Sequence, residues 1–173
     1  VGASVIAIFT FLPIYARESL NAAYSISTSY ISIIALFGIV GQMTLGISSD
    51  KIGRGYSLLI CSLFLSAASF LVLLSDSVFT LYFYAAIYGI GYGAVWPIYA
   101  ATASDLFPKQ FSGGVIGAWT VFLGIGSILA PAFCGWLVDI SVSYNGVFLT
   151  SGIVSILSIG LLIPTLKSFG SNG

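Results

Sequence analysis

Charge and histidine are the scarcest features of this sequence. It contains no histidine, five basic and five acidic residues among 173, and a formal net charge of zero. A chain without histidine cannot form a Ser-His dyad or bind metal or haem through imidazole. Its balanced charge gives no electrostatic basis for binding nucleic acid. Since a soluble domain carries about a quarter charged residues, 6% charged and 58% hydrophobic residues indicate a membrane protein.

Cysteines and intramembrane acidic residues are also scarce. Cys61 and Cys134 each sit inside an apolar run and have no zinc-like spacing, so both are interpreted as packing residues. No pair of acidic residues lies within an apolar run, which excludes an aspartyl intramembrane protease. The sequence therefore predicts a protein that is not an enzyme and that holds neither a metal nor a cofactor.

Long apolar runs are what the sequence has in abundance. A membrane-spanning helix needs about 20 mostly apolar residues, and turn-rich segments separate runs of roughly this length. The runs cover residues 1–16, 26–47, 56–74, 78–101, 115–138 and 147–166. Their unbroken length favours helices over barrel strands. The predicted fold class is an all-α membrane protein, with residues 1–173 forming a single six-helix transmembrane domain and residues 167–173 a flexible tail.

The distribution of charge predicts the orientation of this domain. All ten charged side chains fall in the segments between the runs or in the tail. Lys51, Arg54, Lys109 and Lys167 are predicted on one side of the membrane, and only Arg17 on the other. By the positive-inside rule both termini of the segment are expected in the cytoplasm, with the protein in the cell (plasma) membrane. Because the chain begins on an apolar residue that is not Met, it is interpreted as the continuation of a longer protein.

The segment 46–55, between the second and third runs, resembles a known signature, G-x-x-x-D-[RK]-x-G-R-[RK], of the major facilitator superfamily. The matching residues are Gly46, Asp50, Lys51, Gly53 and Arg54, and Gly55 departs from the closing basic residue. Taken alone, the segment also fits an ordinary basic cytoplasmic loop. Residues 103–110 resemble the family's connection from its tenth to its eleventh helix, and residues 135–139 resemble the outer end of its eleventh helix.

The resemblance implies a fold and a function. The chain would be helices seven to twelve, the C-terminal six-helix half, built as 3+3 inverted repeats and paired in the lipid bilayer with an N-terminal six-helix half. The whole would be a secondary active transporter that moves a small solute, an organic anion for example, by alternating access. A gating charge cluster at the cytoplasmic side would contain Asp50, Lys51, Arg54 and Asp105.

An aromatic stripe on the fourth run is the first candidate for a cargo site. Its residues are Tyr84, Tyr88, Tyr92, Trp96 and Tyr99, at spacings of four, four, four and three. This spacing places them on one side of a helix. They line a water-filled cavity or pack against another helix; the resemblance favours the cavity. The predicted cavity residues are Tyr88, Tyr92, Trp96, Tyr99, Gln42, Phe9 and Pro13.

Other residues have simpler interpretations. Gln42, the only amide within an apolar run, either joins helices or touches the cargo. Glycines of the fifth run, such as Gly117, predict close helix packing, and Trp119 and Trp136 predict anchors at the membrane interface. Two other functions remain open: a sensor or assembly subunit with the same fold that transports nothing, and a channel formed by self-assembly.

Overall fold

The computed structural model describes the backbone of residues 1–170 and the side chains of residues 1–163, and this part of the chain contains helices and no strand. The elements are α1 (Gly2–Glu18), α2 (Tyr24–Gly41), η1 (Gln42–Gly46), α3 (Ile47–Ile52), α4 (Arg54–Val72), α5 (Val78–Leu106), α6 (Lys109–Ser141) and α7 (Asn145–Gly170). Of the tail predicted to be flexible, residues 167–170 continue α7, and residues 171–173 lie outside the described part.

The described elements form six rods. The π-helical turn η1 joins α2 and α3 into one continuous rod, Tyr24–Ile52. Five rods are long and apolar enough to cross a membrane, namely Tyr24–Ile52, Arg54–Val72, Val78–Leu106, Lys109–Ser141 and Asn145–Ile163. The sixth, α1, has 17 residues. The predicted fold class, an all-α membrane protein of six helices, is confirmed.

The helices extend beyond the apolar runs, so the predicted connections were too long. Most of 48–55 is helical and only Gly53 interrupts it, while in 102–114 the interruption is confined to Phe107 and Pro108. Asp50 and Asp105 therefore lie on helices rather than in loops. The physical reason is that the hydrocarbon thickness limits the apolar run, whereas backbone hydrogen bonding continues a helix into the interface.

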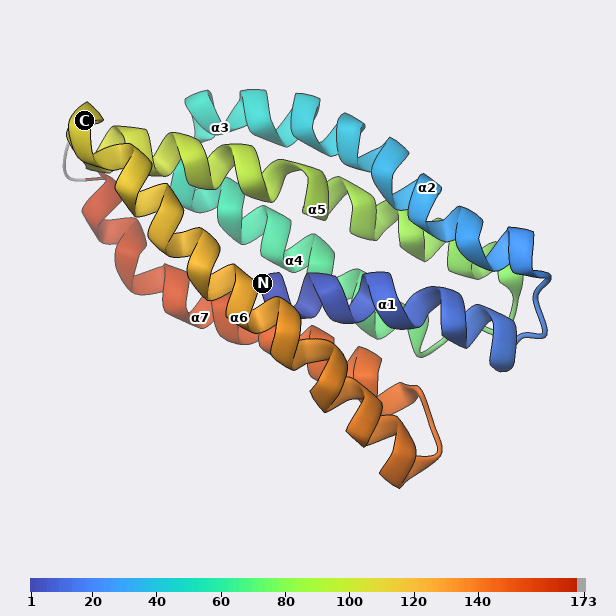
Figure 1. Cartoon of the computed structure of the whole chain (residues 1–173). Coiled ribbons are helices and arrows are strands. Elements are labelled where there is room, and N and C mark those ends of the chain that lie inside the picture. Colours follow the sequence, from blue (N-terminus) through green and yellow to red (C-terminus); the bar gives the residue numbers. More distant parts are fainter. Residues whose placement is uncertain (171–173) are drawn as a thin grey trace.

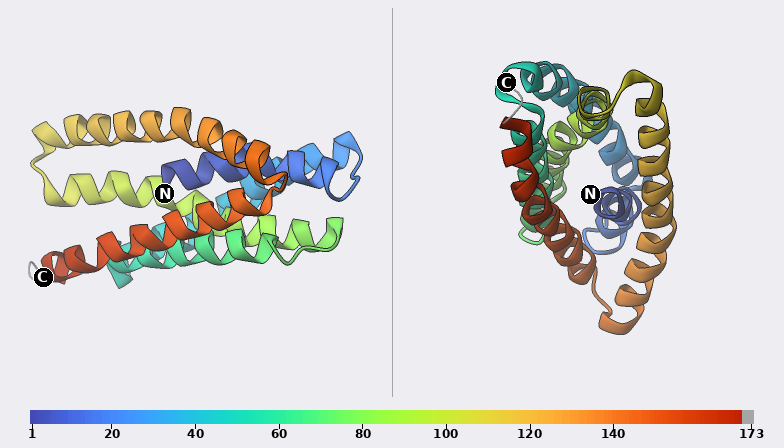
Figure 2. Two further views of the ribbon diagram at one scale, coloured as in Figure 1. Left: turned by 90° about the horizontal axis from the view of Figure 1, so that it is seen from below. Right: turned by 90° about the vertical axis from the view of Figure 1, so that its left-hand side faces the viewer.

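The rods pack around α5 and α1 (Figure 1). α5 lies against α2 and α4, and α4 also packs on α7. α1 runs between α6 and α7, which the end-on view of Figure 2 shows on its two sides. The end that holds the α3–α4 and α5–α6 junctions is called the Arg54 end below. The opposite end, with the α1–α2, α4–α5 and α6–α7 connections, is called the Tyr144 end.

Glycines bring α2 and α5 into backbone contact. A Cβ atom at Gly93 would collide with the Gly38 carbonyl, and one at Gly41 would collide with the Ile90 carbonyl. A Cβ at Gly91 would lie 2.9 Å from the Cys61 carbonyl of α4. Any side chain at these positions would collide with the facing helix. Glycine, which has no side chain, lets the helix backbones approach this closely. The expected close packing in α6 is not found within the described residues, since a Cβ at Gly117 would meet open space.

Buried serines join α1, α4 and α7. The hydroxyl of Ser4 lies 2.7 Å from that of Ser151 and 2.9 Å from that of Ser155, and Ser69 lies 3.3 Å from Ser151. All four side chains are buried. Because hydrocarbon offers no hydrogen-bond partner, each hydroxyl satisfies another across the helix contact. The network fixes α1, which runs past the candidate site, against α7, and Ser69 joins α7 to α4.

Candidate functional site

Arg54 lies at the centre of an ion cluster at the Arg54 end. Its Nε lies 2.9 Å from Asp105 Oδ2 on α5, and its Nη1 lies 2.6 Å from Asp50 Oδ1 on α3. Nη1 also donates to Ser49 Oγ at 2.6 Å. One guanidinium, whose donors form a planar fork, thus connects α3, α4 and α5. These three residues and Ser49 are called the Arg54 cluster.

The sequence explains why the cluster forms. Gly53 has φ +102°, a conformation that favours glycine, and it breaks the rod so that α4 reverses direction immediately after α3. Arg54 is therefore the first residue of α4 and faces back toward Asp50. Lys51 is exposed, and within residues 1–163 it forms no ion pair. Three of the four charges predicted to cluster are brought together, and Lys51 is not.

A pocket of about 540 Å³ lies beside the cluster, between the α2–η1–α3 rod and α5. Asp50, Arg54 and Gln42 line it, together with Pro97 of α5. Gln42 is the first residue of η1 and its side chain is exposed, so among the described residues it does not join two helices. Wide π turns often occur at functional sites, and this one places an amide in the pocket that Asp50 and Arg54 also line.

The aromatic stripe of α5 divides between core and cavity. Tyr88 is 2% exposed, and its hydroxyl donates to the Ser4 carbonyl at 3.3 Å, so it packs inside the bundle against α1. Tyr92 is half-buried, and its ring centroid lies 5.1 Å from that of Phe9 on α1. Pro13 lies one turn further along α1 and is also half-buried. Trp96 and Tyr99, at the later end of the stripe, line a cavity.

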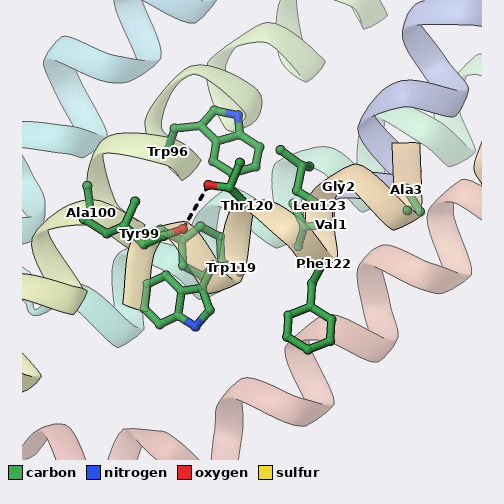
Figure 3. A pocket seen from close by; sticks show the side chains of 12 residues that line it. Val1, Gly2, Ala3, Trp96, Tyr99, Ala100, Trp119, Thr120, Phe122 and Leu123 are labelled. Carbon is green, nitrogen blue, oxygen red and sulfur yellow. Dashed lines mark hydrogen bonds between the residues drawn. The ribbon is translucent and has the colours of Figure 1, made fainter. Parts of the chain in front are cut away.

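This aromatic cavity has a volume of about 400 Å³ and lies between α5, α6 and the first turn of α1. Trp96 and Tyr99 of α5 and Trp119 of α6 form its aromatic wall (Figure 3). The Tyr99 ring centroid lies 6.3 Å from that of Trp96 and 5.7 Å from that of Trp119. Trp119, interpreted from the sequence as an interface anchor, was missed as a cavity residue because no pattern within α6 indicates what faces it.

Aromatic rings and uncharged hydrogen-bond donors line the aromatic cavity. No charged side chain lines it. The Thr120 hydroxyl donates to the Ile116 carbonyl at 2.9 Å, whereas neither indole N–H nor the Tyr99 hydroxyl has a hydrogen-bond partner within residues 1–163. Such a wall can stack against a planar group and donate a few hydrogen bonds. Among the described residues no group of three His, Cys, Asp or Glu side chains is placed to hold a metal ion.

Comparisons with known proteins match nearly the whole chain. Residues 1–171 fit the family model described as Major Facilitator Superfamily. The chain is 30% identical over 172 residues to the probable galactarate/D-glucarate transporter GudP of Bacillus subtilis (strain 168), an alignment that covers 91% of this chain and 37% of that protein.

Two further relatives are named for other functions. The multidrug resistance protein 3 of Bacillus subtilis (strain 168) is 30% identical over 143 residues, or 82% of this chain and 27% of that protein. The benzoate transport protein of Acinetobacter baylyi is 28% identical over 171 residues, or 90% of this chain and 33% of that protein. The chain thus spans about a third of the length of these relatives.

Proposed function

Because the chain belongs to the Major Facilitator Superfamily, we propose that it is part of a secondary active transporter that moves a small solute across the membrane by alternating access. In this proposal the six rods are the C-terminal half, and an N-terminal six-helix half completes the path. Relatives that are named as transporters support this reading.

The aromatic cavity is the observation that carries the proposal. It opens beside the central helix α1, between the Arg54 cluster and the Tyr144 end. Three aromatic side chains, whose donors have no partner among the described residues, line it. Indole and phenol groups in a membrane interior need hydrogen-bond acceptors, which water or cargo would supply. Phe9 and Tyr92 contact each other beyond the cavity, and in this proposal they and Pro13 continue the path toward the Tyr144 end.

An organic anion is the proposed cargo. Relatives named for galactarate, D-glucarate and benzoate transport agree with this class. The aromatic cavity carries no positive charge to pair with a carboxylate, so in the proposal the ring or the carbon skeleton of the anion contacts Trp96, Tyr99 and Trp119. The carboxylate would then be bound by residues of the other half.

The Arg54 end is proposed to face the cytoplasm of the cell. The basic residues Lys51, Arg54 and Lys109 gather at this end, as the positive-inside rule requires. In that orientation the Arg54 cluster holds the cytoplasmic ends of α3, α4 and α5 together and stabilises one state of the transport cycle.

Uptake by the full-length gene product tests the proposed function. Radiolabelled benzoate or D-glucarate is added outside the proteoliposomes in parallel assays, and saturable uptake above protein-free vesicles is expected for at least one anion. The Trp96→Ala change removes an aromatic contact and should raise KM about two- to ten-fold. Trp136→Ala is the matched control, because Trp136 packs on Phe133 and does not line the aromatic cavity. Absence of uptake for every anion with purified, folded protein would refute the proposal.

A further inference from the structure

Glu18 and Tyr144 meet at the Tyr144 end. Glu18 is the last residue of α1, and Tyr144 lies in the turn between α6 and α7. The Tyr144 hydroxyl donates to Glu18 Oε2. Burial and the neighbouring Glu18 carboxylate raise the pKa of Tyr144 to about 12, so the phenol keeps its proton and remains the donor. A hydrogen bond to a charged acceptor is stronger than one between neutral groups.

Tyr15 extends this contact to two more segments. Its ring centroid lies 6.1 Å from that of Tyr144 and 5.2 Å from that of Phe148 on α7, both edge-on. Its hydroxyl donates to the carbonyl of Ser75, in the α4–α5 connection, at 3.3 Å. The last turn of α1 is therefore attached to the α6–α7 turn, to α7 and to the α4–α5 connection.

A small apolar cluster lies directly beneath the contact. Ala7 and Phe11 of α1, Cys134 of α6 and Val147 of α7 form its buried part, and Tyr144 packs against it. Cys134 is 3% exposed. Cys134 also lines an apolar hollow of about 260 Å³ between α1, α6 and α7. Because Tyr144 packs against the same cluster as Cys134, we expect separation of α1 from the α6–α7 turn to increase access to the Cys134 sulfur.

The α6–α7 turn itself is strained. Val142 ends α6 with φ +51°, in the left-handed region that β-branched residues rarely adopt. Its side chain is 89% exposed, so packing of Val142 does not hold this conformation. Sparsely populated backbone conformations persist only where the surroundings impose them. Inside the turn, the Ser141 hydroxyl donates to the Ser143 carbonyl at 3.1 Å and the Asn145 N–H donates to Ser143 Oγ at 3.2 Å. The Tyr144–Glu18 hydrogen bond follows two residues later.

We propose that Glu18 and Tyr144 form a latch that holds α1 against the α6–α7 turn and that opens during transport. The latch connects α1 with α6 and α7, whereas the Arg54 cluster connects α3, α4 and α5, so the two contacts can break separately. Pro13 removes the hydrogen bond that the Phe9 carbonyl would accept, which permits α1 to bend between its contact with Tyr92 and the latch. The latch rests on the proposed function, because it regulates access to the same aromatic cavity.

Labelling of Cys134 tests the latch in the full-length protein. Every other cysteine is replaced, and intact cells are treated with a membrane-impermeant maleimide. Tyr144→Phe keeps the ring but removes the donor, and it is expected to increase the labelling rate of Cys134 about ten-fold. Tyr24→Phe is the matched control, since Tyr24 also lies near the end of α1 but only stacks on Arg17, and it should leave the rate unchanged.

The outcomes separate the latch from the transport proposal. Unchanged labelling in both Tyr144→Phe and Glu18→Ala overturns the latch, whether or not uptake is measured. Faster labelling in these variants, with Vmax changed more than KM, supports it. If the wild type transports no anion but Tyr144→Phe still exposes Cys134, the proposed function fails and the latch stands as a structural contact that opens. Elution of the variants at the wild-type volume in size-exclusion chromatography excludes misfolding.

Discussion

Arg54 illustrates how one side chain can connect three helices at little energetic gain. Its two partners, Asp50 and Asp105, are more than half exposed, so water screens both ion pairs. Exposed pairs are worth about 0.2–1 kcal/mol each. Such a contact is too weak to hold the fold, but it is strong enough to bias an equilibrium between two states of similar free energy. The Arg54 cluster is therefore suited to tuning a conformational rate.

Replacing Arg54 tests this role. Arg54→Ala removes both ion pairs, and we expect the maximal uptake rate to change about two- to ten-fold while KM stays nearly constant, from pairs worth about 0.2–1 kcal/mol each. Initial uptake rates over a range of cargo concentrations measure both quantities. Lys51→Ala removes a neighbouring charge that forms no ion pair in the described chain, and it should have no such effect. Equal Vmax for wild type and Arg54→Ala would refute the role of the cluster.

Some residues of the candidate site could be predicted and others could not. Asp50 and Arg54 are four residues apart around a glycine, so local geometry alone brings them together. The stripe on α5 could be predicted from helical spacing, but which of its residues face a cavity depends on the neighbouring helices. For this reason Tyr88 was expected in the cavity and lies in the core. Trp119 could not be assigned because its neighbour Tyr99 is on another helix.

At the scale of elements, the α2–α5 crossing depends on residues that have no side chain. Gly38 and Gly41 on α2 and Gly89 and Gly93 on α5 let the two backbones touch. In the structure these glycines allow close helix packing. This role could not be predicted from the sequence, because it depends on which helix lies opposite. Helix α5 remains continuous through Pro97.

Adding one methyl group tests the crossing. Gly93→Ala places a Cβ where the Gly38 carbonyl lies, and we expect a loss of about 1–3 kcal/mol in the free energy of unfolding, typical of overpacking. The thermal midpoint of the detergent-solubilised protein should fall by several degrees. Gly160→Ala on α7 is the control, because a Cβ there meets open space within the described residues. A thermal midpoint for Gly93→Ala equal to that of Gly160→Ala would mean that α2 and α5 can move apart at position 93 without loss of stability.

At the scale of the whole molecule, α6 is the least covered of the long rods. Only 11% of its apolar window is buried, compared with 56% for α4. Its glycines at positions 113, 117 and 124 have no neighbour within reach of a Cβ. Lipid would cover such a face without needing glycine, whereas another helix could approach closely there. These features agree with the proposal that a second six-helix half packs on α6.

A bulky residue on α6 tests that partner. Gly117→Leu leaves this six-helix unit undisturbed, since space around the glycine is open, but it should obstruct a helix of the N-terminal half. We expect uptake by the full-length protein to fall about ten-fold or more, as for overpacking by about 1–3 kcal/mol. Gly160→Leu is the matched control. Normal uptake by Gly117→Leu would place lipid, not protein, against this part of α6.

The number of helices could be predicted from hydropathy, whereas their ends could not. Apolar runs report the hydrocarbon thickness, which gave the correct six rods. Asp50 and Asp105 lie on helical turns beyond this layer, where hydropathy carries no signal. The π turn at Gln42–Gly46 likewise has no mark in the residue pattern, and it packs against α5.

This π turn also sets the rotational phase of its rod. An α-helix advances about 100° per residue, and a wider turn holds more residues for the same rotation. The five residues of η1 therefore determine the azimuth at which Asp50 leaves α3, and with it the position of the Asp50–Arg54 pair relative to Asp105 on α5. Deleting one residue from η1 would rotate Asp50 by roughly 100° without altering any charge. The ion cluster consequently tolerates substitution within this turn far better than a change in its length.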